Sequence, residues 1–236
     1  MASSAVDSVI HGFLFSTDEM REIFSDKSWA QKWLDTEAAL AKAQGELGVI
    51  PKEKADIINK YADANLLDLA SIGEFYKSSI TIVPLLKAFK KVLPDNAGEF
   101  VHWGATSQDI VDTGLVLLER DAYQVILRDM KECLKHCLTL AKKYRNTAQA
   151  GRTHVVHAIP ITFGYKAAVW ADELGRDIER LEAMKDRVFV GEMAGAVGTL
   201  ASQPEKGLET QKRMMEILGL NVPTIAWHVA RDNQAE

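Results

Sequence analysis

The chain has 236 residues, a length that fits one to two domains with a sizeable hydrophobic core. Its 28 Lys and Arg residues against 33 Asp and Glu residues give a net charge of −5, and 47% of its residues are hydrophobic, which excludes an intrinsically disordered chain. Because no basic cluster occurs, nucleic acid and anionic lipid are excluded as partners.

The amino terminus and the cysteines indicate a reducing compartment. The first fifteen residues carry no basic stretch and contain Asp7 and His11, so they do not form a secretory signal. The two cysteines, Cys133 and Cys137, are four residues apart in a helical stretch, which argues against a disulfide framework. No apolar run approaches the roughly 20 residues that cross a bilayer. We therefore expect a cytoplasmic protein that does not associate with membranes.

Helical periodicity dominates the first hundred residues. The spacing predicts a helix over 28–47, which Gly48 and Pro51 end. Residues at three- and four-residue steps form its packed face: Trp29, Trp33, Leu34, Glu37, Leu40, Ala41, Gln44 and Leu47. Further helices are predicted over 51–61 and over 71–92, and Pro84 should kink or divide the latter.

The second half of the chain predicts longer helices. Residues 107–144 contain no Gly or Pro after Gly114, so this helix should span roughly 55 Å. Pro160 suits the first position of another long helix, which should end near Val188. The remaining expectations are a packed Gly-rich loop over 191–202, a helix over 204–218 that Gly219 ends, and the start of a further helix over 226–236.

Three polar, Gly-bearing junctions lie at the ends of these helices. In the first junction, Thr106 or Ser107 can cap the helix and Asp109 can complete a capping box, so the positive end of the helix dipole points outward. Such an end attracts carboxylates. The alternative is an ordinary cap without function, against which the adjacent His102 and Trp103 argue.

The second junction, residues 151–157, carries groups suited to proton transfer beside a bound anion. Arg152, Thr153 and His154 supply a fixed cation, a hydroxyl and a titratable base, and His157 follows. Two alternatives remain open: imidazoles that pack in the core, and a zinc site made by these two histidines with His102. We expect no metal, because no Cys or Glu completes a recognisable ligand spacing.

Four motifs resemble the fumarase/aspartase superfamily, in the branch of adenylosuccinate lyase and 3-carboxy-cis,cis-muconate cycloisomerase. They are, in chain order, residues 101–113, 151–164, 195–200 and 227–232. The resemblance implies an all-α, L-aspartase-like fold and a homotetramer. It also implies a helical N-terminal domain over 1–104, followed over 105–236 by the first part of a long helical bundle.

The resemblance also implies a chemistry. Members of this family remove a proton next to a carboxylate and expel a group from the neighbouring carbon, or run a cyclisation by the same logic in reverse, without a cofactor. A small polycarboxylate is therefore the expected substrate. His154 matches the family's active-site histidine and is the expected catalytic residue. The residues expected to bind substrate are His102, Thr106, Ser107, Gln108, Thr153 and Arg231.

Three departures from the family's pattern bear on the reaction. Adenylosuccinate lyases carry a histidine in a stretch that corresponds to residues 77–81, where this chain has Ser79. Trp227 replaces a substrate-binding glutamine, which resembles the cycloisomerases, although His154 is typical of the lyases. The family's mobile Gly-Ser-Ser loop is not found, so we expect a truncated chain. The function predicted is that of a cycloisomerase-like lyase, with a C–N lyase that releases fumarate and a non-catalytic helical assembly protein as alternatives.

Overall fold

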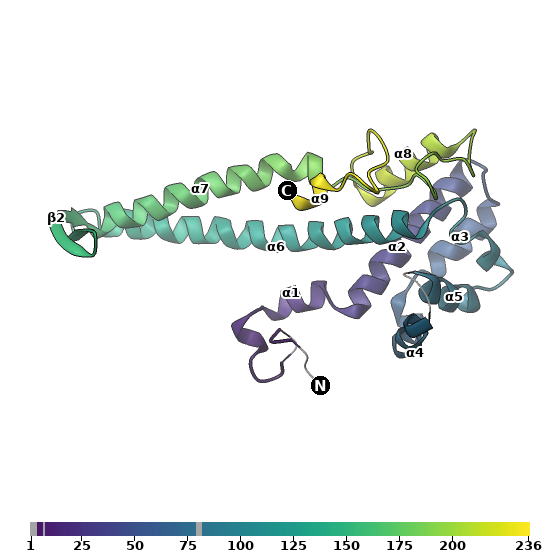
Figure 1. Ribbon diagram of the computed structural model, residues 1–236, viewed down its shortest axis with the longest axis horizontal. Coiled ribbons are helices and arrows are strands. Elements are labelled where there is room, and N and C mark those ends of the chain that lie inside the picture. Colours follow the sequence, from purple (N-terminus) through teal and green to yellow (C-terminus); the bar gives the residue numbers. More distant parts are fainter. Residues whose placement is uncertain (1–3, 7, 79–81) are drawn as a thin grey trace. The chain divides into compact units, whose positions relative to one another are not determined.

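The computed structural model describes residues 4–6, 8–78 and 82–236, and helices dominate it (Figure 1). The chain divides into two compact units: unit 1 is Met1–Asp121 with Asp186–Glu236, and unit 2 is Ala122–Lys185. Two long helices, α6 (Ser107–Lys143) and α7 (Phe163–Val188), contribute residues to both units. The all-α class predicted from the sequence is confirmed. The predicted domain boundary at residue 105 stays a prediction.

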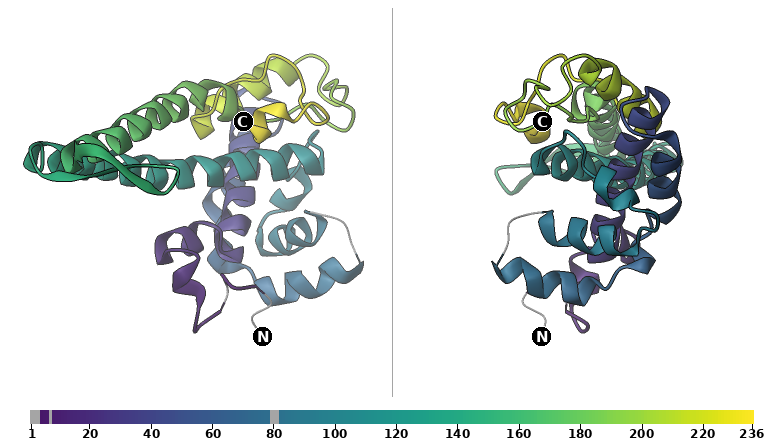
Figure 2. Two further views of the ribbon diagram at one scale, coloured as in Figure 1. Left: turned by 60° about the vertical axis from the view of Figure 1, so that its left-hand side comes forward. Right: turned by 90° about the vertical axis from the view of Figure 1, so that its right-hand side faces the viewer.

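Unit 1 is built around one long helix, α2. Its other helices are α1 (Asp18–Ile23), α3 (Lys52–Tyr61), α4 (Leu69–Phe75), α5 (Val83–Val92), α8 (Gly207–Leu218) and α9 (Asp232–Ala235), with 3-10 turns at Gly12–Leu14, Ala64–Leu66, Tyr76–Ser78 and Ala97–Phe100. Helix α2 (Asp26–Glu46) begins after Ser25, whose hydroxyl accepts a hydrogen bond from the Ser28 amide. It packs against α3 and α8, as the two views of Figure 2 show.

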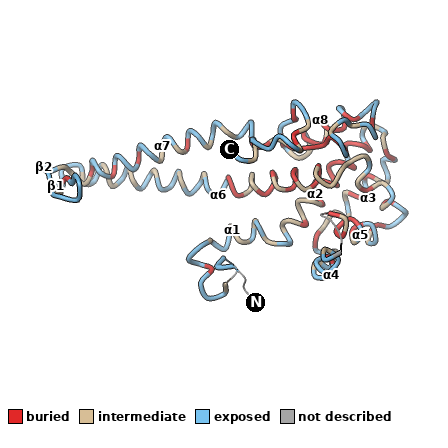
Figure 3. The backbone as a smooth tube through the Cα atoms, viewed as in Figure 1, coloured by how far each residue is buried: buried red, intermediate tan, exposed pale blue. Residues whose placement is uncertain are grey.

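The core of unit 1 joins elements that are distant in sequence. Large apolar side chains that are fully buried come from five helices and one loop: Leu34, Leu40, Ile58, Phe89, Ile110, Leu118, Met193, Met214 and Met215. Figure 3 shows this buried material in α2, in the first part of α6 and around α8. The loop over 191–202 is packed, as predicted, because Met193 and Ala194 are buried.

Proline and glycine act in unit 1 largely as the sequence predicts. The expected helix over 71–92 is divided: α4 ends at Phe75 and α5 starts at Val83 with Pro84 in its first turn, where its missing amide proton is not needed. Gly219 ends α8 in the left-handed conformation, with φ +65°.

Ser79, which stands where the lyases have a histidine, lies outside the described residues. The helix expected from Ala226 is shorter than predicted, since α9 starts only at Asp232.

Unit 2 consists of the two long helices and a β-hairpin between them (Figure 1). Helices α6 and α7 are antiparallel there, and Lys131 Nζ lies 2.7 Å from Glu182 Oε1 across the pair. Strands β1 (Ala148–Thr153) and β2 (Val156–Thr162) form an antiparallel hairpin, the only sheet in the described part of the chain.

The hairpin corrects one prediction. Pro160 does not start the second long helix: it lies in β2 opposite Ala150, and α7 begins at Phe163. A two-stranded sheet has only edge strands, which tolerate a proline. The sequence does not indicate this turn, because its two positive-φ positions are occupied by His154 (+47°) and Val155 (+68°) and not by Asn-Gly, the usual signal. Within the described residues, no helix combines the length and apolar character needed to span a membrane.

Candidate functional site

The start of α6 shows the half of the predicted capping box that Asp109 supplies. The Thr106 amide donates a hydrogen bond of 2.8 Å to Asp109 Oδ2, the reciprocal half of a capping box. Ser107 is the first residue of α6, and Thr106, Ser107 and Gln108 are all half-buried. The positive end of the helix dipole therefore lies beside two hydroxyl-bearing residues that are only partly covered.

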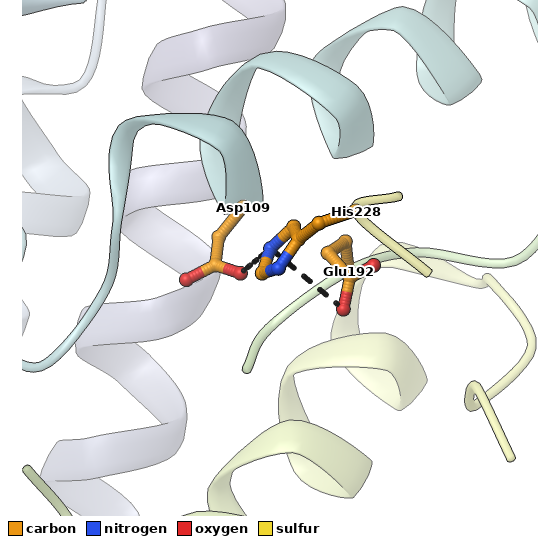
Figure 4. Close-up of side chains that lie close together, drawn as sticks. All are labelled: Asp109, Glu192 and His228. Atoms are coloured by element: carbon orange, nitrogen blue, oxygen red, sulfur yellow. Dashed lines mark hydrogen bonds and ion pairs between the residues drawn. The ribbon is translucent and has the colours of Figure 1, made fainter. Parts of the chain in front are cut away.

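The Asp109 carboxylate joins three segments of unit 1. It is fully buried, and besides Thr106 it accepts hydrogen bonds from the Ala194 amide (2.9 Å, Oδ1) and the Gly195 amide (3.0 Å, Oδ2). His228 Nε2 lies 2.8 Å from Oδ1 (Figure 4). One side chain thus fixes the packed loop and the segment before α9 to the start of α6.

Glu192 lies next to this anchor and is also fully buried. Its Oε2 accepts a hydrogen bond of 2.7 Å from the Trp227 amide, and its Oε1, 4.0 Å from His228 Nε2, has no hydrogen-bond partner among the described residues. Burial raises the pKa of the Glu192 carboxyl to about 7, against an ordinary value of 4.5. Thr113 holds the Glu192 backbone, because its hydroxyl donates to the carbonyl (2.9 Å) and accepts from the amide (2.8 Å).

The three side chains in Figure 4 have potential metal-ligand atoms within 4.8 Å of one another. The donors around Asp109 argue against a metal there, since each of its oxygens already accepts two hydrogen bonds. We interpret Asp109, Glu192 and His228 as a polar cluster whose hydrogen bonds to backbone amides position the segments around it. The zinc alternative of the sequence is not tested, because His102 belongs to unit 1 whereas His154 and His157 belong to unit 2.

A second carboxylate on α6, that of Asp112, accepts hydrogen bonds from two of the predicted binding residues. Gln108 Nε2 donates to its Oδ1 at 2.7 Å, and the Arg231 guanidinium binds both of its oxygens, with Nη2 2.9 Å from Oδ1. The hydrogen bond to Asp112 raises the pKa of Arg231, whose guanidinium also lies 5.6 Å from the centre of the Trp227 ring. On the same helix, burial raises the pKa of Glu119 to about 7.

The first predicted binding residue, His102, is paired with a carboxylate from α2. Its Nδ1 lies 2.6 Å from Glu37 Oε1, and its backbone amide donates to Glu37 Oε2 at 3.0 Å. Glu37 is buried and the His102 side chain is 18% exposed. The imidazole is therefore held from one side and reaches the surface on the other.

Thr153 and His154 lie in unit 2, at the tip of the hairpin, and both are exposed. Unit 1 thus carries His102, Thr106, Ser107, Gln108 and Arg231, and unit 2 carries the other two predicted residues. Of these side chains, Gln108 and Arg231 meet at Asp112. The roles of all seven stay predictions.

Sequence reasoning identified Asp109 only as part of the capping box and gave no site role to the other carboxylates that organise the site. Glu37 offered a signal, because it is an acidic residue on the packed face of a helix, where charged residues are rare unless they are paired. Asp109 and Asp112 are three residues apart and share one helix face, so both carboxylates should face the same neighbouring segments. Glu192 gave no comparable signal within its Gly-rich segment.

Comparison with known proteins agrees with this architecture. A profile of the lyase family matches residues 13–232. N-acetyl-S-(2-succino)cysteine lyase from Enterococcus italicus is 48% identical over 239 residues, which cover 100% of this chain and 52% of that protein. Adenylosuccinate lyase from Methanothermobacter thermautotrophicus is 46% identical over 226 residues, which cover 95% of this chain and 50% of that protein.

A solved structure of a related enzyme has a similar fold. The crystal structure of β-carboxy-cis,cis-muconate cycloisomerase from Acinetobacter calcoaceticus matches with a TM-score of 0.91 at 35% identity, over 95% of this chain and 53% of that one. The chain spans about half the length of these relatives. The match over residues 13–232 and these identities show that the chain belongs to the lyase family of the fumarase/aspartase superfamily, which includes adenylosuccinate lyase and 3-carboxy-cis,cis-muconate cycloisomerase.

Proposed function

We propose that the full-length protein is a cofactor-independent lyase that eliminates a group from a small polycarboxylate. The observation that supports the proposal best is that unit 1 carries, a few residues apart in the chain, the dipolar start of α6 and an imidazole held by a buried carboxylate. Removal of a proton next to a carboxylate leaves negative charge on the carboxylate oxygens, and helix ends, hydroxyls and cations stabilise such charge.

The substrate we propose is a succinyl thioether such as N-acetyl-S-(2-succino)cysteine, on which the 48% identical relative is named as acting. A base takes a proton from the succinyl carbon that neighbours the sulfur-bearing carbon. The electrons of that C–H bond form the new double bond, and the C–S bond breaks with its electron pair leaving on sulfur. The products are fumarate and N-acetylcysteine, whose thiolate takes up a proton.

The proposed roles follow the motif resemblance. His154 is the catalytic residue for proton transfer, working with a carboxylate supplied from later in the chain. The substrate carboxylates are bound by His102, Thr106, Ser107, Gln108, Thr153 and Arg231. A homotetramer would supply these groups from neighbouring subunits, which is compatible with their distribution over both units of one chain.

A cycloisomerase is the second candidate. It is favoured by Trp227 and His228 followed by Arg231 and Asp232, the pattern that resembles the cycloisomerases, and by a 37% identical relative named 3-carboxy-cis,cis-muconate cycloisomerase. A C–N lyase of the adenylosuccinate type remains a further alternative, and in that reaction nitrogen replaces sulfur as the leaving atom.

The test is a substrate panel on the full-length protein. N-acetyl-S-(2-succino)cysteine, adenylosuccinate and 3-carboxy-cis,cis-muconate are supplied separately, and products are followed by ultraviolet absorbance and chromatography. We expect fumarate and N-acetylcysteine in equal amounts from the first compound. If a folded full-length protein turns over none of the three, the lyase proposal fails and the non-catalytic assembly protein is favoured.

A further inference from the structure

We propose that Glu37 is the positioning residue for His102, holding its imidazole as the Nδ1–H tautomer so that Nε2 is the atom offered to the substrate. The proposal rests on the proposed function and adds to it a residue on α2, 65 positions before the histidine that it orients.

The hydrogen-bond geometry assigns the tautomer. An ionised carboxylate can only accept hydrogen bonds, and both oxygens of Glu37 face His102: one the backbone amide at 3.0 Å, the other Nδ1 at 2.6 Å. Nδ1 therefore carries the proton. Within the described part of the chain Nε2 makes no hydrogen bond, and the ring is partly exposed. The free lone pair thus lies on the outward-facing nitrogen.

The same carboxylate also binds the backbone at His102. His102 has φ +66°, a left-handed conformation that is unfavourable for a residue other than glycine. Such strain persists where the surroundings over-determine it. Here the Glu37 carboxylate binds the His102 amide, while the Trp103 carbonyl accepts hydrogen bonds from Gln44 Nε2 (2.7 Å) and Gln203 Nε2 (3.3 Å).

Glu37 and Gln44 are seven residues apart and so lie on the same face of α2, two turns from each other. Both are buried, and both direct their polar groups at the loop that carries His102. A carboxylate in this position determines which nitrogen of the His102 ring carries the proton.

The chemical consequence concerns Nε2. As a bare nitrogen it accepts a proton, and once protonated it is a charged donor for a substrate carboxylate, with the Glu37 carboxylate balancing that charge. In the other tautomer Nε2–H is an uncharged donor that cannot take a proton. Loss of the Glu37 charge should therefore change what His102 can do, and leave the shape of the loop in place.

The first test reads the tautomer directly in the full-length protein with ¹⁵N-labelled histidine. Glu37→Gln keeps the volume: its carbonyl oxygen can accept from the His102 amide, and its amide nitrogen can donate to Nδ1, which requires the ring proton to move to Nε2. His102→Asn identifies which signal belongs to His102, and asparagine suits a positive φ. We expect Nδ1–H in the wild type and Nε2–H in the variant. An Nε2–H tautomer in the wild type overturns the proposal, even if the variant does not fold.

The second test is a double-mutant cycle on kcat/KM with N-acetyl-S-(2-succino)cysteine. Glu37→Gln should lower kcat/KM at least about tenfold in the wild type and by less than about twofold in the His102→Asn background, because Glu37 acts through that ring. Glu46→Gln, a carboxylate on the same helix that pairs with Arg213, is the matched control and should leave kcat/KM unchanged. An equal loss in both backgrounds would show a purely structural role and overturn the proposal.

The two tests separate this proposal from the function on which it rests. If none of the three candidate substrates is turned over, the lyase proposal fails, and the tautomer experiment still decides whether Glu37 orients His102. If activity is present and the tautomer is the same in the wild type and in Glu37→Gln, only the positioning role is lost.

Discussion

His228 Nε2 lies 2.8 Å from Asp109 Oδ1, although 119 positions of the sequence separate the two residues. The same carboxylate binds three backbone amides, from Thr106, Ala194 and Gly195. Asp109 therefore has two structural roles. It caps α6, and it holds the packed loop and the segment before α9, which bring Glu192 and Arg231 to that helix.

Replacement of Asp109 should destabilise unit 1. In Asp109→Asn, an amide nitrogen faces at least one of the four donors that the carboxylate now accepts, so a buried donor is left without a partner. We expect the free energy of unfolding to fall by about 2–4 kcal/mol, measured by urea unfolding followed by circular dichroism.

The matched control is Asp129→Asn, on the same helix at an exposed position. It should change the free energy of unfolding by less than about 0.5 kcal/mol. A similarly small change in Asp109→Asn would show that the carboxylate does not hold the three segments together.

Glu192 should make stability depend on pH. Its folded-state pKa of about 7 lies above the ordinary 4.5, so between these pH values the folded state binds more protons than the unfolded state, and stability falls as the pH rises. One pKa unit corresponds to about 1.4 kcal/mol, so the loss from pH 4.5 to pH 8 reaches at most about 3 kcal/mol. Below pH 4.5 this contribution is fully present.

Glu192→Gln checks this by urea unfolding at several pH values. The variant should match the wild type near pH 4 and exceed it near pH 8, since glutamine cannot ionise and its carbonyl oxygen can still accept from the Trp227 amide. Glu119, whose pKa is also about 7, contributes a slope of the same sign that should remain. An unchanged pH dependence in Glu192→Gln would contradict the raised pKa.

Gly114 should be required where α6 crosses α2. A Cβ added there would lie 2.5 Å from Trp33 Cδ1, so Gly114→Ala forces the indole or the helices to shift. We expect a loss of about 1–3 kcal/mol in the free energy of unfolding. Gly175→Ala in α7 is the control, because its Cβ meets nothing within 4 Å and alanine favours helix by roughly 0.5–1 kcal/mol. If both substitutions stabilise the protein, the crossing is looser than described.

His154 should be needed for turnover and not for folding. It is exposed at the tip of the hairpin, and asparagine suits its positive φ, so His154→Asn should leave secondary structure and oligomeric state unchanged. If the ring transfers a proton, kcat for the full-length protein should fall about 100-fold or more. His157→Asn, at another exposed position of the hairpin, should keep its activity. A variant at 154 that fails to assemble would instead show a structural imidazole.

The local sequence was sufficient for most of the helices. The helix expected from residue 107 to about 144 is observed as Ser107–Lys143, and the one expected over 51–61 as Lys52–Tyr61, because apolar spacing and the Gly and Pro residues at helix ends act within a few residues. The capping box of Thr106 and Asp109 was predictable for the same reason. The hairpin was not, since His154 and Val155 adopt a turn that their own preferences disfavour.

By itself, then, the sequence determined an all-α chain, most of its helix ends and the polar junctions that carry the family motifs. Only the tertiary structure decided which groups meet there: Glu37 with His102, Asp109 with His228, and Asp112 with Arg231. The physical reason is distance along the chain. Capping and periodicity follow from neighbouring residues, whereas the partner of a buried carboxylate depends on how segments 65 to 119 residues apart pack against each other.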